Sequence, residues 1–270
     1  MLRLSTNQMK SWKTAKLARH LLALALTSSF LAFSAAMEGR SEEALKAARR
    51  AREFVTDDLI ATMPGMDWPF SEVYSVLVRF GRWDEMIAEP PPNPSFKALT
   101  GGYLYAKATA LAAKGCIVEA KRTVAALEKL AGGLPAEAAA GSNTAKDVLA
   151  VGALVAKARI ASTQNESEEA INLLQQAVAK EDQLAYDEPA DWFFPVRHLL
   201  GAELLKAGRA KEAEAVYQAD LKRHPANGWA LAGLSAALDA EQKSGAAAKA
   251  KAQMESAWKN ADLKLVSSAF

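Results

Sequence analysis

A spacing of five residues recurs along the chain and constrains its fold more than any other feature. A turn-forming residue is followed five positions later by a small or apolar residue. The six turn-forming positions are Gly39, Gly81, Gly115, Asn165, Gly208 and Gly245, and their partners are Ala44, Met86, Ala120, Ala170, Ala213 and Ala250. Successive turns lie about 34 to 50 residues apart, the range in which one repeat is one helical hairpin. The spacing therefore predicts six antiparallel helix pairs that follow one another along the chain.

The composition favours an all-α protein. Only 7% of the 270 residues are aromatic, and the alternating β-branched pattern of strands is scarce. Lys and Arg total 33 against 31 Asp and Glu, so the net charge of +2 gives no electrostatic case for nucleic-acid binding. The single cysteine, Cys116, excludes an internal disulfide framework and a cysteine-based zinc site. Its place beside the third turn predicts a small buried hydrophobic residue.

The N-terminal residues 1–36 form a basic and apolar leader with two interpretations. The apolar stretch 21–36 follows basic residues and ends in small residues that suit a signal peptidase, and no acidic residue precedes Glu38. Its roughly 16 residues are fewer than the ~20 that a membrane span needs. The repeat spacing instead makes residues 29–38 the first helix of the first pair. A signal peptide places the protein in the bacterial periplasm or envelope, and a repeat helix places it in the cytoplasm.

The clearest repeat lies near the C-terminus, where residue types follow one another in an order with a physical reason for each. A first glycine allows the two helices of the pair to approach closely, and a second glycine ends the first helix. An alanine and a tyrosine then pack between the helices, and a proline ends the second helix. These residues are Leu200, Gly201, Leu204, Gly208, Ala213, Tyr217 and Pro225. The order resembles the tetratricopeptide repeat (TPR), which implies a right-handed α-solenoid of about six TPR-like hairpins.

Two stretches are similar to an uncharacterised group of bacterial TPR proteins. The first is residues 63–92 with its RFGRWDE segment, and the second runs from Tyr186 through an EPxxWxxPxR segment to Leu231. The resemblance covers residues 30–270 and matches the C-terminal half of longer relatives, so a fragment of a longer TPR protein is one alternative. The chain departs from the group at Ala190, where a second proline is usual, and it lacks a His-Asn-rich segment upstream. The group carries no activity over to this chain.

The repeats divide the chain into two lobes. The N-terminal lobe is residues 37–131, the C-terminal lobe is residues 144–270, and the glycine-rich stretch 132–143 between them is a candidate flexible joint. Two repeats depart from the pattern. In the second, prolines 90–92 limit the second helix to a stub from Trp83 to about Glu89. In the sixth, an insertion around Ser244 and Gly245 displaces the turn.

Motifs for catalysis are absent from the sequence, which contains no HExxH, Walker, GxGxxG or GxSxG pattern. No cofactor and no metal are therefore expected. The best polar group is Asp187, Glu188, Asp191, Arg197 and His198. If Asp191 and His198 share a helix face two turns apart, they are candidates for acid–base work. In the alternative that we favour, Asp191 caps a helix and Arg197 braces the preceding loop.

Aromatic residues favour binding over catalysis. Three rings, at 192–194, are expected at the start of a helix, and Trp68, Phe70 and Tyr74 form a similar group. We therefore expect a non-enzymatic scaffold that binds a peptide or helix of a protein partner in a concave groove. The candidate partner-binding residues are Trp192, Arg197, Tyr186, Glu188, Trp68, Tyr74, Arg79 and Arg82. The alternative is an enzyme, or an accessory subunit of one, with its site between Asp187 and His198.

Overall fold

The computed structural model describes residues 6–63, 65–265 and 267–270, with side chains from residue 19 onward. Thirteen α-helices make up most of this part of the chain, and its only sheet is a pair of two-residue strands. The predicted all-α class is confirmed. In chain order the elements are α1 (Thr6–Met37), α2 (Ser41–Glu53), α3 (Asp57–Ala61), the 3-10 helix η1 (Trp68–Ser71), α4 (Glu72–Arg79), α5 (Trp83–Ala88), α6 (Lys97–Ala113), α7 (Ile117–Gly132), β1 (Ala139–Ala140), β2 (Asn143–Thr144), α8 (Ala145–Thr163), α9 (Ser167–Glu181), α10 (Val196–Lys206), α11 (Ala210–Arg223), α12 (Gly228–Ala240) and α13 (Ser244–Ala257).

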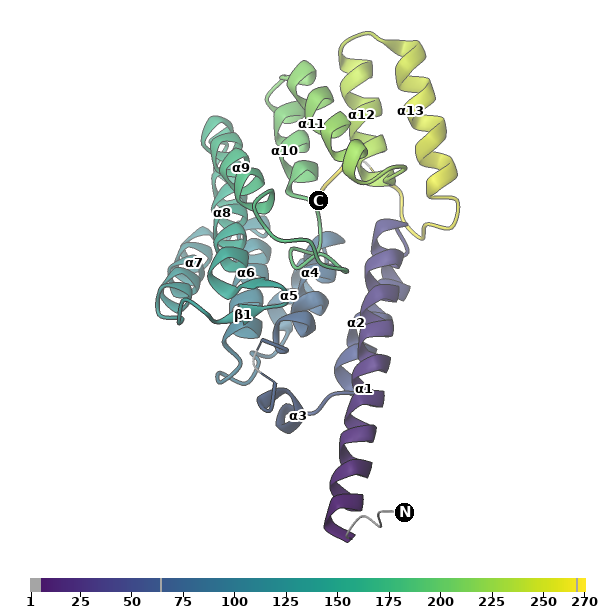
Figure 1. Ribbon diagram of the computed structural model, residues 1–270. Coiled ribbons are helices and arrows are strands. Elements are labelled where there is room, and N and C mark those ends of the chain that lie inside the picture. Colours follow the sequence, from purple (N-terminus) through teal and green to yellow (C-terminus); the bar gives the residue numbers. More distant parts are fainter. Residues whose placement is uncertain (1–5, 64, 266) are drawn as a thin grey trace.

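The helices pack in sequential pairs, as the spacing predicts. The pairs are α1 with α2, α4 with α5, α6 with α7, α8 with α9, α10 with α11, and α12 with α13. Neighbouring pairs also pack on each other through α2 and α4, α5 and α6, α6 and α8, α9 and α10, and α11 and α12 (Figure 1). The second pair is the smallest because α5 ends at Ala88, just before prolines 90–92, which confirms the predicted stub.

The turn inside each pair has one shared backbone geometry. One residue has a positive φ, and the next residue donates its N–H to the carbonyl five positions back at 2.8 to 2.9 Å, the arrangement of a Schellman motif. The positive-φ residues are Gly39, Gly81, Gly115, Asn165, Gly208 and Gln242. Five residues after each turn residue, the side chain is at most 1% exposed at Ala44, Met86, Ala120, Ala170, Ala213 and Ala247.

Five of the six predicted turns are confirmed, and the sixth is corrected. Its turn residue is Gln242 rather than Gly245, which lies in the first turn of α13. Counted from Gln242, the buried partner is Ala247 instead of Ala250, and the sixth repeat needs no insertion. The prediction failed here because a glutamine in the left-handed region is unusual, while a glycine stood three residues away.

The prediction that Cys116 is buried is wrong. Cys116 is exposed and occupies the N-cap of α7, directly after the third turn. At this point the chain crosses from one helix of the pair to the other at the tip of the hairpin, where side chains face water. The corresponding residues of the other five pairs are all charged: Arg40, Arg82, Glu166, Arg209 and Lys243.

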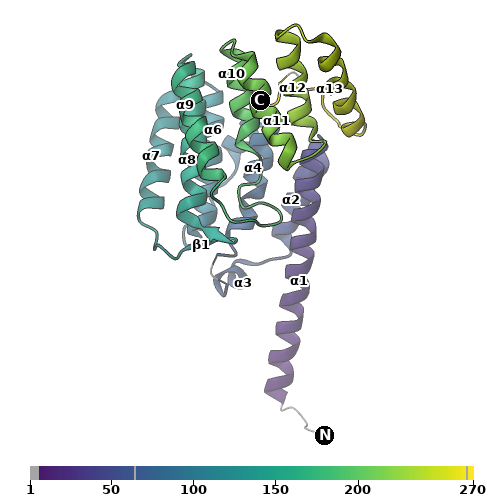
Figure 2. The same cartoon turned by 45° about the horizontal axis from the view of Figure 1, so that its top comes forward.

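Helix α1 packs on the body through its C-terminal part. Ala32, Ala35 and Ala36 are fully buried, and this part of α1 packs against α2. The N-terminal part of α1 projects away from the other helices (Figures 1 and 2). The stretch Arg19–Met37 is long and apolar enough to cross a membrane, a test that core helices and signal sequences also pass. The signal-peptide and repeat-helix interpretations both stay predictions.

The first and last helix pairs contact each other. The indole N–H of Trp229 on α12 donates to the Ala36 carbonyl at 3.0 Å, and that of Trp258 donates to the Met37 carbonyl at 3.0 Å. The Asp262 carboxylate then accepts the N–H groups of Ser41 and Glu42 at 2.9 and 3.0 Å, which caps the N-terminus of α2. The last helix pair therefore contacts the first and closes the series of pairs. Asp262, which follows α13, is hydrogen-bonded to the start of α2.

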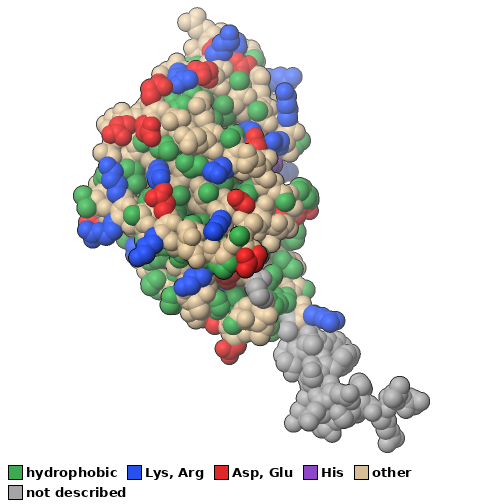
Figure 3. Space-filling model, turned by 60° about the vertical axis from the view of Figure 1, so that its left-hand side comes forward, with side chains coloured by type: hydrophobic (Ala, Val, Ile, Leu, Met, Phe, Trp, Pro, Cys, Tyr) green, Lys and Arg blue, Asp and Glu red, His purple; other side chains and the backbone are tan. Residues whose placement is uncertain are grey.

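The surface carries charges of both signs. On the face that holds the left-hand helices of Figure 1, Lys and Arg side chains lie among Asp and Glu side chains (Figure 3). The stretch 132–143, predicted as a joint, contains the end of α7, strand β1 and the first residue of β2, while α6 packs on α8 across it. The division into two lobes stays a prediction.

Candidate functional site

A pocket of about 310 Å³ lies where the first helices of four consecutive pairs converge. One repeat position, six residues before the turn residue, supplies a lining residue from each pair: Ser75 of α4, Thr109 of α6, Arg159 of α8 and Ala202 of α10. Two further segments complete the wall, the aromatic loop 192–195 and the chain's own residues 267, 269 and 270. We call this cavity the central pocket and residues 267–270 the tail.

The pocket wall carries three cations and one carboxylate. Arg79, Arg159 and Lys206 are the cations, and Glu203 is the carboxylate. Glu203 accepts a hydrogen bond from the Ser162 hydroxyl at 2.6 Å, and Lys206 donates to the Ser162 carbonyl at 2.9 Å. Burial lowers the pKa of Arg159, although it remains a cation at neutral pH. The pocket therefore favours an occupant that offers carbonyl or other electron-rich oxygens.

The tail forms part of the pocket wall and is held there by specific contacts. The Ser268 hydroxyl donates to the His198 carbonyl at 2.8 Å and lies 2.6 Å from the Tyr217 hydroxyl, which must then be the donor between the two. Ser268 is only 1% exposed. The backbone oxygen of Phe270 accepts a hydrogen bond from Arg159, and the Phe270 ring meets Trp229 edge to face at 6.0 Å.

The aromatic loop precedes α10 rather than beginning it, which corrects the expected placement of the three rings. Pro195 is the N-cap of α10, and the residues before it are not helical. Trp192 meets Tyr105 edge to face at 4.9 Å, and Phe193 stacks on Trp68 at 6.0 Å. Phe194 receives the Arg79 guanidinium over its ring at 5.2 Å. The loop therefore forms one wall of the pocket from core-packed rings.

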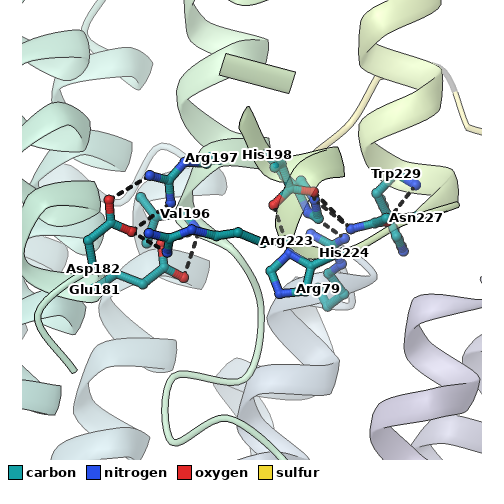
Figure 4. Close-up of polar contacts among 11 residues, drawn as sticks. Arg79, Glu181, Asp182, Val196, Arg197, His198, Arg223, His224, Asn227 and Trp229 are labelled. Carbon is teal, nitrogen blue, oxygen red and sulfur yellow. Dashed lines mark hydrogen bonds and ion pairs between the residues drawn. The ribbon is translucent and has the colours of Figure 1, made fainter. Parts of the chain in front are cut away.

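A buried polar cluster lies behind this wall (Figure 4). His198 is fully buried, and burial together with the nearby Arg79 lowers its pKa to about 4, so its imidazole is neutral at pH 7. Its Nδ1 accepts from Arg79 at 2.8 Å, and its Nε2–H donates to Asp220 at 3.0 Å. Burial alone would raise the pKa of Asp220, but hydrogen bonds from His198 and His224 hold it below its usual range. This cluster joins α4, α10 and α11 without contact to solvent at His198.

A second polar cluster holds the start of α10 (Figure 4). Both oxygens of Asp182, at the end of α9, accept from the Arg197 guanidinium at 2.8 and 2.6 Å, and Arg223 of α11 donates to the same carboxylate at 2.5 Å. The Glu181 carboxylate accepts the Val196 N–H at 3.2 Å and thereby caps α10. Arg197 thus braces the preceding connection, as the structural alternative predicts.

The predicted role of Asp191 as a helix cap is wrong. Its carboxylate instead accepts the Ser142 N–H at 3.0 Å and the Asn143 amide at 2.7 Å, at the turn between β1 and β2. Since α10 begins only at Val196, Asp191 and His198 do not share a helix face. The acid–base pair expected from their spacing is therefore not assembled.

The candidate binding residues separate into three places. Arg79 and Trp192 line the central pocket. Trp68 and Tyr74 are buried in the core, and Arg197 is engaged by Asp182. The remaining three lie on the surface: Arg82 pairs with Glu42 and Glu85, and Tyr186, 81% exposed, donates to Glu188.

Sequence reasoning missed Tyr105, Arg159 and Lys206, and also the tail. The signal that would have found Arg159 is its repeat position, because the same position in the neighbouring pairs faces the pocket. The tail has no such signal, since it lies outside the repeats.

No protein-family model matches the chain, and a search of curated proteins finds no match. The class of protein that the structure defines is a mostly helical protein whose helices pack in sequential pairs. Among the described residues, no group of three or more His, Cys, Asp or Glu side chains is placed to hold a metal ion.

Proposed function

We propose that the chain is a TPR-like scaffold, a right-handed α-solenoid of six hairpins, that binds an extended peptide of a protein partner in the central pocket. The repeat assignment is supported by the six Schellman turns, each followed five residues later by a buried side chain. It is also supported by the close approach of α10 and α12 to Tyr217. A Cβ at Gly201 or Gly233 would lie 2.3 or 2.1 Å from that ring.

One observation carries the peptide-binding proposal: a non-helical segment of the chain, the tail, already lies along the wall of the pocket. The tail is held through a buried serine hydroxyl, a backbone oxygen and an aromatic ring. These are the kinds of contact by which grooves recognise extended peptides, with main-chain polar contacts for affinity and side-chain subsites for specificity. The groups that receive them lie on helices α8, α10, α11 and α12, so the site is formed before a ligand binds.

The geometry favours binding over the enzymatic alternative. His198, the base that acid–base chemistry would need, is fully buried and engaged on both ring nitrogens. Asp191 is held by the β-turn, and Asp187 accepts from Ser142 at 2.9 Å. A general base must come within hydrogen-bond reach of its substrate, which this arrangement does not offer at His198.

The proposal is tested with peptides. A library of random peptides is panned against the full chain and against the full chain carrying Phe270→Ala, and the enriched peptides are measured by fluorescence anisotropy. Arg159→Glu reverses the charge that holds the Phe270 backbone oxygen, so we expect it to weaken binding about tenfold or more. Arg122→Glu is the matched control, because Arg122 is exposed on α7 and does not line the pocket.

Two results would contradict the proposal. One is that neither form of the chain enriches any peptide. The other is that Arg159→Glu and Arg122→Glu bind the enriched peptides as tightly as the unchanged chain does, which would place binding on another surface.

A further inference from the structure

We propose that the tail is an intramolecular stand-in for the partner peptide, and that the surface that holds it, at the edge of the central pocket, selects segments with a hydroxyl residue two positions before an aromatic ring. This inference rests on the proposed peptide-binding function. It adds the chemistry of the partner, and it makes the tail a competitor that a partner must displace.

The first subsite is specific for a hydroxyl group. Ser268 is almost fully buried, and its oxygen both donates to the His198 carbonyl and accepts from Tyr217. Alanine at this place would leave the Tyr217 hydroxyl without its partner in a buried site. A larger side chain would have to displace the groups around Ser268, which is only 1% exposed. The subsite therefore favours serine.

The second subsite takes an aromatic ring. Phe270 lies over the turn at Gly81, where a Cβ would come within 3.0 Å of the Phe270 Cβ, and its ring meets Trp229 edge to face. Trp229 is itself backed by Arg79, whose guanidinium lies 3.6 Å from the ring centroid. An aromatic ring gains both the apolar contact and the edge-to-face geometry here, and an aliphatic side chain gains only the first.

The central pocket is open beside the tail. A cavity of about 310 Å³ remains beside it, and the tail itself forms one wall of that cavity. Lys206 lines this space as well, and its side chain is 46% exposed. A partner peptide that continues into this space and offers a carbonyl to Lys206 would make contacts that the tail does not make. Such a peptide can displace the tail although the tail is tethered.

The tether sets the strength of the competition. Trp258 and Asp262 are anchored to the first hairpin, so the tail begins only a few residues from a fixed point. A short tether gives a local concentration of about millimolar. A free peptide of similar intrinsic affinity is therefore excluded until the tail is weakened or the peptide binds better.

The test uses the full chain and a labelled synthetic peptide of residues 263–270, Leu-Lys-Leu-Val-Ser-Ser-Ala-Phe. The double variant Ser268→Ala, Phe270→Ala weakens the internal tail, and we expect it to bind the peptide about tenfold or more tightly than the natural chain does. Lys264→Ala, at an exposed position of the same segment, is the matched control and should bind as the natural chain does. A peptide with alanine in place of its second serine should bind the double variant about tenfold more weakly.

Hydrogen exchange of the natural chain gives a second measurement that does not depend on the variants. Excess peptide, or a peptide enriched from the library, should increase exchange in residues 267–270 while the helices stay protected. Equal binding of the peptide to the natural chain and the double variant would overturn the competition and leave the proposed peptide-binding function standing. Absence of binding to both would overturn the tail motif, and library peptides that still depend on Arg159 would keep the proposed function. A natural chain that is dimeric, but monomeric in the double variant by light scattering, would overturn the intramolecular assignment.

Discussion

Glu72 is buried where α4 begins, and its carboxyl group faces α1. One oxygen accepts a hydrogen bond from Ser29 at 2.5 Å, and the other has no partner among the described residues. Burial raises the pKa of Glu72 from its ordinary value of 4.5 to about 8, against a smaller opposite effect of the Ser29 hydrogen bond. The folded chain therefore binds more protons at this group than the unfolded chain between these two values. The free energy of unfolding should fall as the pH rises from about 4.5 to about 8.

Glu72→Gln tests this dependence, because glutamine keeps an acceptor for Ser29 and does not titrate. Between pH 5 and 8, we expect the free energy of unfolding of the variant to depend less steeply on pH, by the contribution of about one proton. At pH 8 it should be about 1–3 kcal/mol more stable than the natural chain, after allowing for the burial of its amide N–H groups. Urea unfolding at several pH values measures both quantities. Glu119→Gln, at an exposed position of α7, should leave the slope unchanged, and parallel curves for the two variants would refute the assignment.

Residue types in the sequence indicate the chemistry available but not which side chains meet. His198 was identified as a candidate, yet its partners Arg79 and Asp220 lie 119 and 22 positions away along the chain. Their spacing predicts one helix for Asp191 and His198, but the aromatic loop separates Asp191 from α10, which begins at Val196. Of the residues that line the central pocket, the sequence therefore predicts only Arg79 and Trp192 as binding residues. The pairing of distant helices and the position of the tail depend on tertiary contacts that local spacing does not encode.

The helix pair is the element that the sequence predicts best, because each turn depends on a few adjacent residues. A glycine can adopt positive φ at no steric cost, and the small residue five positions later is needed where the two helices touch. The sixth turn escaped this reasoning because Gln242 adopts φ of 61° without being a glycine. An L-residue in this region costs about 1–2 kcal/mol, so the turn is held by its surroundings rather than by its own preference.

Gln242→Gly should therefore stabilise the chain, although glycine also adds entropy to the unfolded state. We expect a net gain of about 0.5–1 kcal/mol. Gly245→Ala should give a similar gain for another reason, since Gly245 is helical and a Cβ there meets no atom within 4 Å. Gly208→Ala should destabilise, because Gly208 has φ of 74°. Thermal unfolding of the three variants checks which residue forms the sixth turn. If Gly245→Ala destabilises the chain and Gln242→Gly does not stabilise it, the turn lies at Gly245.

At the scale of the whole molecule, the closure between the first and last pairs distinguishes this chain from an open array. In an open array each repeat contacts only its neighbours, and terminal repeats exchange and fray first. Here the Trp258 ring lies between the first turn and the start of α12. A Cβ at Gly39 or at Gly228 would come within 2.9 or 2.2 Å of it. Its indole N–H also holds the Met37 carbonyl. The spacing of the repeats could not predict this contact, because Trp258 follows the last repeat helix.

Trp258→Ala should therefore release the first pair while leaving the middle of the chain intact. Removing a buried tryptophan costs about 3–5 kcal/mol, and here the lost contacts are those that join the first turn, after α1, to α12. Hydrogen exchange should show faster exchange in α2, and in the part of α1 around Ala32–Ala36, with little change in α8 and α9. Trp83→Ala is the control, because Trp83 lies on α5 away from this junction and its loss should not single out α2. If exchange rises equally in all helices, the chain unfolds as one unit and closure gives the first pair no separate protection. If α2 is unaffected while Trp258→Ala is folded, the Trp258 contact does not hold the two ends together.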